Sequence, residues 1–187
     1  MPSPAELARA VAAAPPLLGA TRLVCVDGPA GSGKTTTAAR LAEALEPLTG
    51  VPAVVHMDDL YAGWTLTGAA ARLAAGVLRP LAEGRPGALR PWDWHAGAFA
   101  GQPVPVPVAP VLVVEGCGCS VRRLDRWTTL RVWVEAPPEL CARRWRERGG
   151  PEMARHQADW ARREALVFAA EQTRARADVH LDGTAAW

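Results

Sequence analysis

The eight residues from Gly28 to Thr35 read Gly-Pro-Ala-Gly-Ser-Gly-Lys-Thr and match the pattern G-x-x-x-x-G-K-[ST], which is typical of a loop that binds nucleotide phosphates. Lys34 is the only lysine in the chain, and every other Lys or Arg position is arginine. A compact ammonium group on a flexible stem suits a point charge that reaches the β- and γ-phosphates. The alternative is that GC-rich coding replaced the other lysines and left this one by accident.

The segments on either side of the loop favour phosphate binding. Arg22 to Asp27 is an apolar run that predicts a buried strand, and Thr36 to Glu46 has apolar residues at helical spacing until Pro47 is expected to stop the helix. In this arrangement backbone N–H groups and the helix N-terminus face an anion, and the Thr35 hydroxyl is available to Mg²⁺. We therefore expect the following residues to contact ATP: Gly28, Ala30, Gly31, Ser32, Gly33, Lys34, Thr35 and Thr36.

Composition limits the other functions open to the chain. Its 187 residues, 49% of them hydrophobic, predict one domain over residues 1–187. The formal net charge of +2 gives no strong basic field, so we do not expect a nucleic-acid partner. No apolar stretch approaches the roughly 18 uncharged residues of a membrane span.

The N-terminus and the cysteines favour a cytoplasmic location. Met1 to Ala14 lacks a basic start followed by an apolar core, and Ser3 to Glu6 is instead typical of a helix capping box. The sequence leaves a homo-oligomer open. Four cysteines lack zinc or redox spacing and are expected to be reduced and packed: Cys25, Cys117, Cys119 and Cys141.

Apolar runs alternate with helical segments along the rest of the chain. Further strands are predicted at Val51–Met57, Val111–Glu115, Leu130–Glu135 and Val179–Leu181, with an extended piece at Ala88–Trp94 and an edge or connecting segment at Gly101–Pro110. Further helices are predicted at Thr67–Glu83, Pro138–Arg148 and Pro151–Ala177. Continuous apolar runs separated by helices predict a three-layer α/β fold, with a mostly parallel five-stranded sheet and helices on both faces.

Two carboxylates follow predicted strands at the edge where the loop also lies. Asp58 comes after the second apolar run and Glu115 ends the Val-rich one. Ligands bind at the carboxyl ends of the strands in an open parallel sheet. Phosphoryl transfer needs Mg²⁺, positioned charge and a carboxylate that accepts the proton of the attacking hydroxyl. Asp58 is therefore a candidate for the base or for a metal-side ligand, and Glu115 for a metal-associated residue; the alternative for each is a helix cap or turn.

These residues resemble the P-loop nucleoside kinases of the uridine kinase type. The resemblance rests on the loop, on Met57-Asp58-Asp59-Leu60-Tyr61, on Val113-Val114-Glu115-Gly116, and on an Arg-rich helix that leads into a lid. It implies a P-loop NTPase fold with a small helical lid, near residues 143–158. It also implies that Asp58 is the catalytic aspartate near Mg²⁺ and that Glu115 is metal-associated.

Arginines in the lid region are candidates for phosphate contacts. By resemblance, Arg144 and Arg148 fall where lid arginines clamp the phosphates, and an arginine over the transferring group would stabilise its charge. We therefore add Arg144 to Lys34 and Asp58 as a catalytic candidate. The helical spacing of Arg143, Arg144, Arg146 and Arg148 places two pairs on different sides, so one pair is expected to face solvent.

The predicted acceptor site departs from the uridine kinase pattern. That family carries an Asp-His-Pro segment after the tyrosine that helps to hold the ribose, whereas Ala62 to Gly68 here contains no carboxylate. Aromatic walls with a few polar groups suit a small-molecule pocket, although core packing is the commoner fate of tryptophan. We expect Trp133, Trp145 and Trp160 to be structural. With Asp58, the expected substrate contacts are Tyr61, Trp64, Arg90, Trp92, Asp93 and His95.

The leading hypothesis is an ATP- and Mg²⁺-dependent kinase of a small-molecule hydroxyl, with a uridine- or cytidine-like nucleoside as the family-based choice of acceptor. A second hypothesis is a kinase of a non-nucleoside alcohol, such as a cofactor precursor, a sugar acid or a secondary metabolite. A third is an ATPase or switch that acts on a protein partner. The chain has no asparagine for a guanine-reading Asn-Lys-x-Asp segment, and none of Gln102, Gln157 and Gln172 follows a predicted strand end at the site.

Overall fold

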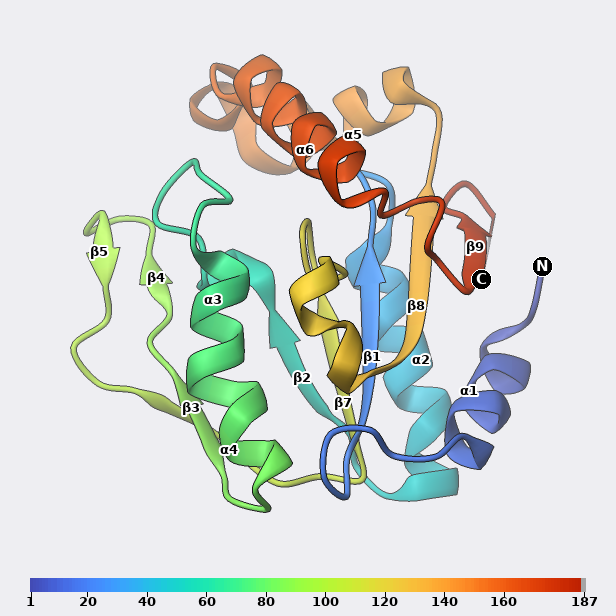
Figure 1. The fold of residues 1–187 in the computed structure, drawn as a ribbon. Coiled ribbons are helices and arrows are strands. Elements are labelled where there is room, and N and C mark those ends of the chain that lie inside the picture. Colours follow the sequence, from blue (N-terminus) through green and yellow to red (C-terminus); the bar gives the residue numbers. More distant parts are fainter. Residues whose placement is uncertain (186–187) are drawn as a thin grey trace.

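The computed structural model describes residues 1–185 and has at its centre a sheet of five parallel strands in the order β2-β7-β1-β8-β9 (Figure 1). On β1, Val24 lies opposite Val113 of β7 and Val26 opposite Val132 of β8. This sheet confirms the predicted α/β fold. Its strands are β1 (Arg22–Asp27), β2 (Ala53–His56), β7 (Val111–Glu115), β8 (Thr128–Glu135) and β9 (Val179–Asp182).

The remaining elements surround this sheet. The helices and single turns are α1 (Pro4–Ala13), α2 (Lys34–Thr49), η1 (Met57–Asp59), α3 (Ala69–Leu73), η2 (Ala74–Leu78), α4 (Arg79–Ala82), η3 (Arg122–Trp127), α5 (Pro138–Ala154) and α6 (Gln157–Glu171). Two small antiparallel pairs lie apart from the central sheet: β3 (Gly87–Leu89) with β6 (Val104–Val106), and β4 (Trp92–Asp93) with β5 (Ala98–Phe99). Figure 1 shows α5 and α6 above the carboxyl ends of β1 and β8.

The continuous apolar strands arise because both faces of the sheet are buried. On β1, Val24 and Val26 pack in a cluster with residues of α1 and α2, whereas Leu23 and Cys25 pack in a second cluster with residues of α3, α4 and η3. Successive side chains of a strand point to opposite faces, so the two central strands β1 and β7 contribute to both clusters. Helices therefore cover both faces, as the sequence predicted.

Helix α2 runs further than the sequence predicted. It begins at Lys34 and continues through Pro47 to Thr49, so the prediction that Pro47 stops it is wrong. The proline lies in the last turn, where its missing N–H costs only one intrahelical hydrogen bond. The helix ends instead at Gly50, whose N–H donates to the Glu46 carbonyl and whose φ of 85° favours glycine.

The single helix predicted from Pro151 to Ala177 is also wrong. Helix α5 continues to Ala154 with a kink at Gly150 (φ 60°, ψ −162°), and α6 begins at Gln157 and ends at Glu171. Gln172 then adopts a left-handed conformation with φ 51°. Arginine and alanine favour helix throughout this segment, so their composition does not mark where one helix ends and the next begins.

The segment predicted as a helix from Thr67 to Glu83 is helical from Ala69 to Ala82, with a π-turn in its middle. In that turn the Arg79 N–H donates to the Ala74 carbonyl, one residue further back than in an α-helix. Pro80 follows directly, and a wider turn relieves the clash of its ring with the preceding turn. Proline therefore modifies this helix without ending it.

Several smaller predictions are confirmed. The Ser3 hydroxyl accepts a hydrogen bond from the Glu6 N–H, and the Glu6 carboxylate accepts one from the Ser3 N–H, which completes the capping box of α1. All four cysteines are buried and free.

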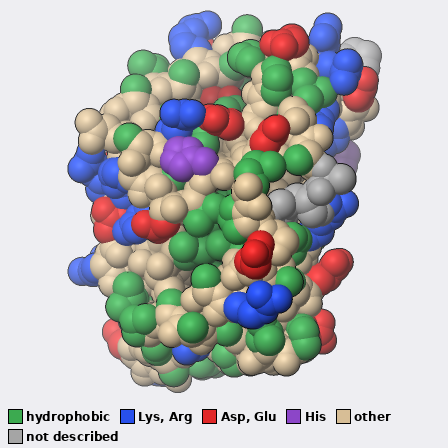
Figure 2. Space-filling model, turned by 90° about the vertical axis from the view of Figure 1, so that its right-hand side faces the viewer, with side chains coloured by type: hydrophobic (Ala, Val, Ile, Leu, Met, Phe, Trp, Pro, Cys, Tyr) green, Lys and Arg blue, Asp and Glu red, His purple; other side chains and the backbone are tan. Residues whose placement is uncertain are grey.

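Acidic and basic side chains are interspersed on the face shown in Figure 2. Among residues 1–185, no helix combines the length and apolarity needed to cross a membrane.

Candidate active site

A cavity of about 970 Å³ lies at the carboxyl ends of the parallel strands, between the loop after β1, the segments after β2 and β7, and helices α5 and α6. Ligands of open parallel sheets bind at this edge. The predicted site residues that line it are Ala30, Gly31, Gly33, Lys34, Thr35, Thr36, Asp58, Tyr61, Trp64, His95, Glu115, Arg144 and Arg148. The predicted site residues that do not line it are Gly28, Ser32, Arg90, Trp92 and Asp93.

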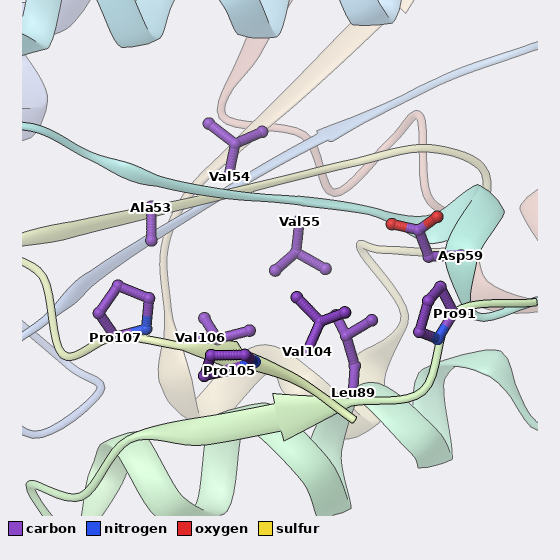
Figure 3. Close-up of a pocket in the computed structure, with 10 residues that line it drawn as sticks. All are labelled: Ala53, Val54, Val55, Asp59, Leu89, Pro91, Val104, Pro105, Val106 and Pro107. Carbon is purple, nitrogen blue, oxygen red and sulfur yellow. The ribbon is translucent and has the colours of Figure 1, made fainter. Parts of the chain in front are cut away.

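A second cavity, of about 310 Å³, lies between β2 and the β3–β6 pair (Figure 3). Its walls are almost entirely apolar, and Asp59 lies at one end beside Pro91. None of the described residues that line it is Lys or Arg, so it does not suit a phosphate. The larger cavity is therefore the candidate active site.

The loop after β1 needs glycine at the positions where it turns against neighbouring backbone. A Cβ on Gly28 (φ 146°) would lie 2.0 Å from the Val134 carbonyl oxygen, and one on Gly31 (φ 82°) would lie 2.4 Å from the Cys141 carbonyl oxygen. Only glycine adopts these backbone conformations without steric cost. The close approach brings the loop against β8 and α5 and leaves Gly31 and Gly33 facing the cavity.

Lys34 is 8% exposed and begins helix α2. Its Nζ donates to the Pro29 carbonyl at 2.8 Å, which holds the ammonium group back along the loop. Burial acts to lower the pKa of Lys34, but neighbouring acidic groups, including Cys117, Glu164 and Glu115, raise it overall. The only lysine of the chain is thus a charged group beside the cavity.

Thr35, Glu115 and His56 form a chain of polar contacts at the cavity wall. The Thr35 hydroxyl donates to Glu115 Oε1 at 3.3 Å, and His56 Nδ1 lies 2.7 Å from the same oxygen. The hydrogen bond to Glu115 raises the pKa of His56. Sequence reasoning had no signal for His56, because a lone histidine at a strand end is not typical of any one kind of site.

Asp58 lies in the same cavity, on the short η1 turn after β2. Its side chain is open to the solvent that fills the cavity but has protein on several sides. This partial desolvation, together with the charge of Glu115, raises the pKa of Asp58. Two carboxylates that repel each other across a cavity are a suitable arrangement for a shared cation or a transferable proton.

The site residues fit Mg²⁺ bound together with a nucleotide. A threonine hydroxyl and carboxylate oxygens are the hard oxygen donors that Mg²⁺ prefers, and this ion is commonly held by one or two carboxylates plus substrate phosphates. Among the side chains that the structure describes, those of residues 1–150 and 153–185, no group of three or more His, Cys, Asp or Glu could hold a metal ion by itself. Thr35, Asp58 and Glu115 therefore suit an ion whose coordination is completed by phosphate and water.

Asp27, at the end of β1, is a functional neighbour that the sequence did not single out. It is fully buried, and its carboxylate accepts hydrogen bonds from the backbone N–H groups of Gly28 (2.8 Å), Gly118 (3.1 Å) and Ser120 (2.9 Å). These bonds join the phosphate-binding loop to the segment after Glu115. Asp27 thus fixes the relative position of the loop and of that glutamate. Burial raises its pKa to about 6.

The raised pKa of Asp27 predicts a pH-dependent stability. The folded pKa of about 6 exceeds the ordinary value of 3.8, so the folded state binds more protons between these values and stability falls as pH rises through that window. Relative to Asp27→Asn, the wild-type free energy of unfolding should fall by about 2 kcal/mol between pH 4 and pH 7. Denaturant unfolding of both proteins at several pH values measures this; parallel pH profiles would contradict it.

Glu164 of α6 ties the lid side of the cavity to the loop. It is 7% exposed, and its Oε2 accepts hydrogen bonds from the Ala30 N–H at 3.0 Å and from Cys117 Sγ at 3.2 Å. Burial raises the pKa of Glu164. In the sequence, Glu164 cannot be distinguished from a solvent-exposed glutamate, because it lies in an Arg- and Ala-rich helix. Only the fold identifies its contact with the loop.

The arginines of α5 separate as their spacing predicted. Arg144 Nη1 donates to the carbonyls of Gly31 (3.2 Å) and Gly183 (3.0 Å), and Arg148 also lines the cavity. Arg143 instead pairs with Glu147 on the exposed side of the helix, where Arg146 also lies. Arg144 therefore joins the loop to the end of β9.

The segment after β9 is a part of the cavity wall that the sequence did not indicate. Residues 181–185 line the cavity, and Gly183 packs so closely on the loop that a Cβ there would lie 1.7 Å from the Ser32 carbonyl oxygen. Ligands bind at the carboxyl ends of parallel strands. Because Val179–Leu181 was predicted as the last strand, this rule could have predicted that the residues after it belong to the site.

The predicted acceptor cluster divides between the cavity and a neighbouring hairpin. His95, one of the expected contacts, lines the cavity, and its neighbour Trp94, which was not among them, lines it too. Trp145 and Trp160, for which the sequence favoured a structural role, also line it. Asp93 instead accepts hydrogen bonds from the His95 and Ala96 N–H groups, both at 2.9 Å. Its contacts thus stabilise the turn between β4 and β5.

The other two members of that cluster also make hairpin contacts. Arg90 Nη1 donates to the Gly101 carbonyl at 2.7 Å, and the Trp92 ring packs edge-on against Phe99 with centroids 4.9 Å apart. The structure does not bring Arg90, Trp92 or Asp93 to the cavity wall. A substrate role for these three side chains remains a sequence prediction only.

Comparisons with known proteins agree with this architecture. A family model described as an AAA domain matches residues 24–165. A candidate uridine kinase from Bacillus stearothermophilus superposes with a TM-score of 0.62 at 20% identity, over 87% of this chain and 89% of that one. A candidate fructose transport system kinase from Silicibacter sp. TM1040 superposes with a TM-score of 0.66 at 18% identity, over 96% and 99%. At these identities the likeness shows the fold, that of P-loop NTPases. A search of curated proteins gives no match.

Proposed function

The chain belongs to the AAA domain family of P-loop nucleotide-binding proteins, and we propose that it is an ATP- and Mg²⁺-dependent kinase that transfers the γ-phosphoryl group to a hydroxyl of a small molecule. One observation carries the proposal. Lys34 and Thr35 of the phosphate-binding loop line the same cavity as Asp58 and Glu115, which come from two other strands. A phosphate site beside a candidate general base is what phosphoryl transfer to an alcohol requires.

In this proposal the protein acts mainly by positioning groups and placing charge. The loop N–H groups and Lys34 bind the β- and γ-phosphates, and Arg144 and Arg148 approach them from α5. Asp58 accepts the proton of the acceptor hydroxyl. Thr35 and Glu115 are the residues that would hold Mg²⁺, which, when bound, neutralises phosphate charge. Closure of residues 143–158 over the reacting groups would exclude water.

The acceptor class stays open between two proposals. The resemblance to the uridine kinase type favours a nucleoside. A non-nucleoside alcohol is favoured by the segment after Tyr61, where Ala62 to Gly68 contains no carboxylate to hold ribose hydroxyls. Among the residues that line the cavity, the carboxylates are Asp58, Glu115 and Asp182. A switch or ATPase is disfavoured because, within the part of the chain that the structure describes, no glutamine lines the cavity to position an attacking water.

Acceptor-dependent release of ADP tests the proposal. We expect purified protein with ATP and Mg²⁺ to release ADP slowly alone and at least about 100-fold faster when the correct alcohol is added, because a bound acceptor replaces a poorly positioned water. A panel of nucleosides, sugar acids and other alcohols, with the product identified by mass, separates the two acceptor classes. ADP release that no alcohol stimulates, but that a protein partner does, would favour the switch.

A further inference from the structure

One part of the cavity wall, which we call the aromatic half, is formed by tryptophan rings, and Trp64 lies at their centre. Its ring centroid is 4.9 Å from that of Trp94, 5.9 Å from Trp145 and 6.2 Å from Trp160. It also stacks on His156 with centroids 4.3 Å apart and an interplanar angle of 15°. These four indoles come from separate segments of the chain and all line the cavity that holds Lys34.

The rings differ in their exposure. Trp145 and Trp160 are 4% and 5% exposed and form the floor, whereas Trp64 is half-buried and Trp94 is 42% exposed at the rim. Core packing accounts for the two floor residues. It does not account for Trp94, because a large apolar ring that is left facing a cavity gains little from folding alone. His156 covers one face of Trp64, so the surface available to a ligand is the rest of the Trp64 ring and the exposed part of Trp94.

Two polar groups in this half of the cavity are already bonded within the protein, whereas the Trp160 indole N–H has no hydrogen-bond partner among the described residues. The Tyr61 hydroxyl donates to the Cys117 carbonyl at 2.9 Å, and the Trp145 indole N–H donates to the Met153 carbonyl at 2.9 Å. Met153 adds an apolar side chain to the wall. A sugar acid or a polyol would lose its hydration here and find few partners, which disfavours such acceptors.

Asp58 lies at the border of this aromatic half. It is three residues before Tyr61, whose ring packs edge-on against Trp160 at 5.0 Å. The charge of Asp58 is among the causes, after burial and Cys117, that raise the pKa of the Tyr61 hydroxyl. Asp58 and Trp64 line the same cavity, so an acceptor with its ring against Trp64 can present its hydroxyl to the candidate base.

Resting on the proposed kinase function, we propose that the acceptor is an alcohol whose hydroxyl is joined by a short link to a flat aromatic ring, with no sugar between them. The ring lies against Trp64 and Trp94, and the hydroxyl points toward Asp58. Stacked and edge-to-face aromatic pairs add interaction beyond the burial of apolar area. Arg148 on the same wall disfavours a cationic ligand, for which an aromatic cage would otherwise be suitable.

The acceptor side of the proposal is tested with matched alcohols. Benzyl alcohol and pyridylmethanols carry a hydroxymethyl group on a flat ring, whereas cyclohexylmethanol carries it on a saturated ring of similar size. We expect kcat/KM to be at least about tenfold higher for the best aromatic alcohol than for cyclohexylmethanol, uridine, glycerate or choline. Equal or higher values for any of these four would overturn the aromatic proposal while leaving the kinase function intact.

The protein side is tested with tryptophan variants. Trp94→Ala, at an exposed position where folding is not at risk, and Trp64→Ala should each raise KM for the aromatic alcohol at least about tenfold and leave KM for ATP unchanged. Trp64→Phe should recover most of the affinity. Trp127→Phe is the matched control, because Trp127 is a tryptophan outside the cavity and should change neither constant.

Direct binding separates failure of this proposal from failure of the kinase function. Tryptophan fluorescence, measured with each alcohol in the absence of ATP, should change saturably with the aromatic alcohols, and in Trp94→Ala and Trp64→Ala the change should need at least about tenfold more alcohol. If no alcohol is phosphorylated but the aromatic ones bind in this way, the kinase function fails and the aromatic site stands. If aromatic alcohols produce no saturable change, or if KM in Trp94→Ala and Trp64→Ala matches wild type, the aromatic site is overturned.

Discussion

Lys34→Arg should lower kcat for phosphoryl transfer about 100-fold or more, although arginine replaces lysine at every other basic position of this chain. Lys34 is 8% exposed, and its ammonium group donates to the Pro29 carbonyl at 2.8 Å. Cys117, Glu164 and Glu115 lie near enough to raise its pKa. A planar guanidinium is larger than an ammonium and cannot turn its donors independently, so it does not fit the same space without moving the loop.

Steady-state kinetics and nucleotide binding together distinguish a chemical effect from a structural one. Lys34→Arg should retain the wild-type unfolding midpoint to within a few degrees and should bind ADP at most moderately more weakly. Arg143→Lys is the matched control, because Arg143 lies on the exposed side of α5 and pairs only with Glu147 among the described ion pairs. Its kcat should equal that of wild type. A Lys34→Arg enzyme with kcat within threefold of wild type would show that the loop needs only a positive charge.

The sequence predicted the sheet because burial of both faces leaves a direct trace in composition. β1 and β7 are apolar at almost every position, and strands of this kind occur in parallel sheets covered by helices. The helix ends were harder to predict. At Pro47 the outcome depends on whether the proline lies in the last turn, and in α5 the kink follows from the backbone angles at Gly150 rather than from a change in residue type.

In the candidate site, the sequence predicted the functional side chains that lie at or after the ends of strands. It did not predict the side chains that hold the site together by accepting hydrogen bonds from backbone N–H groups. Lys34, Asp58 and Glu115 were found because motif and strand position are both local. Asp27 and Glu164 bond to backbone N–H groups from distant segments, and no local pattern records such a contact. The acceptor cluster was only partly predicted, because neighbours in the sequence of a hairpin point in different directions. Trp94 and His95 line the cavity, whereas Asp93 accepts a hydrogen bond within the hairpin turn.

Asp58→Asn should lower kcat about 1,000-fold while leaving ATP binding nearly unchanged, and the adjacent Asp59→Asn should leave both within threefold. The two aspartates are neighbours on η1 and differ in the cavity that they line. Asp58 faces the large cavity with Lys34 and Glu115, whereas Asp59 faces the apolar cavity between β2 and β6 (Figure 3). The pair is therefore matched in chemistry, charge and sequence position.

Asparagine keeps the size of aspartate but cannot accept the proton of the acceptor hydroxyl, so the loss should appear in kcat and should not be recovered at higher acceptor concentration. Mg²⁺ titrations at fixed ATP separate the two roles open to Asp58. If it is the base, kcat stays low at saturating Mg²⁺; if it only helps to hold the ion, excess Mg²⁺ restores most of the rate. Equal losses in Asp58→Asn and Asp59→Asn would contradict both roles, because they would trace the effect to the turn itself.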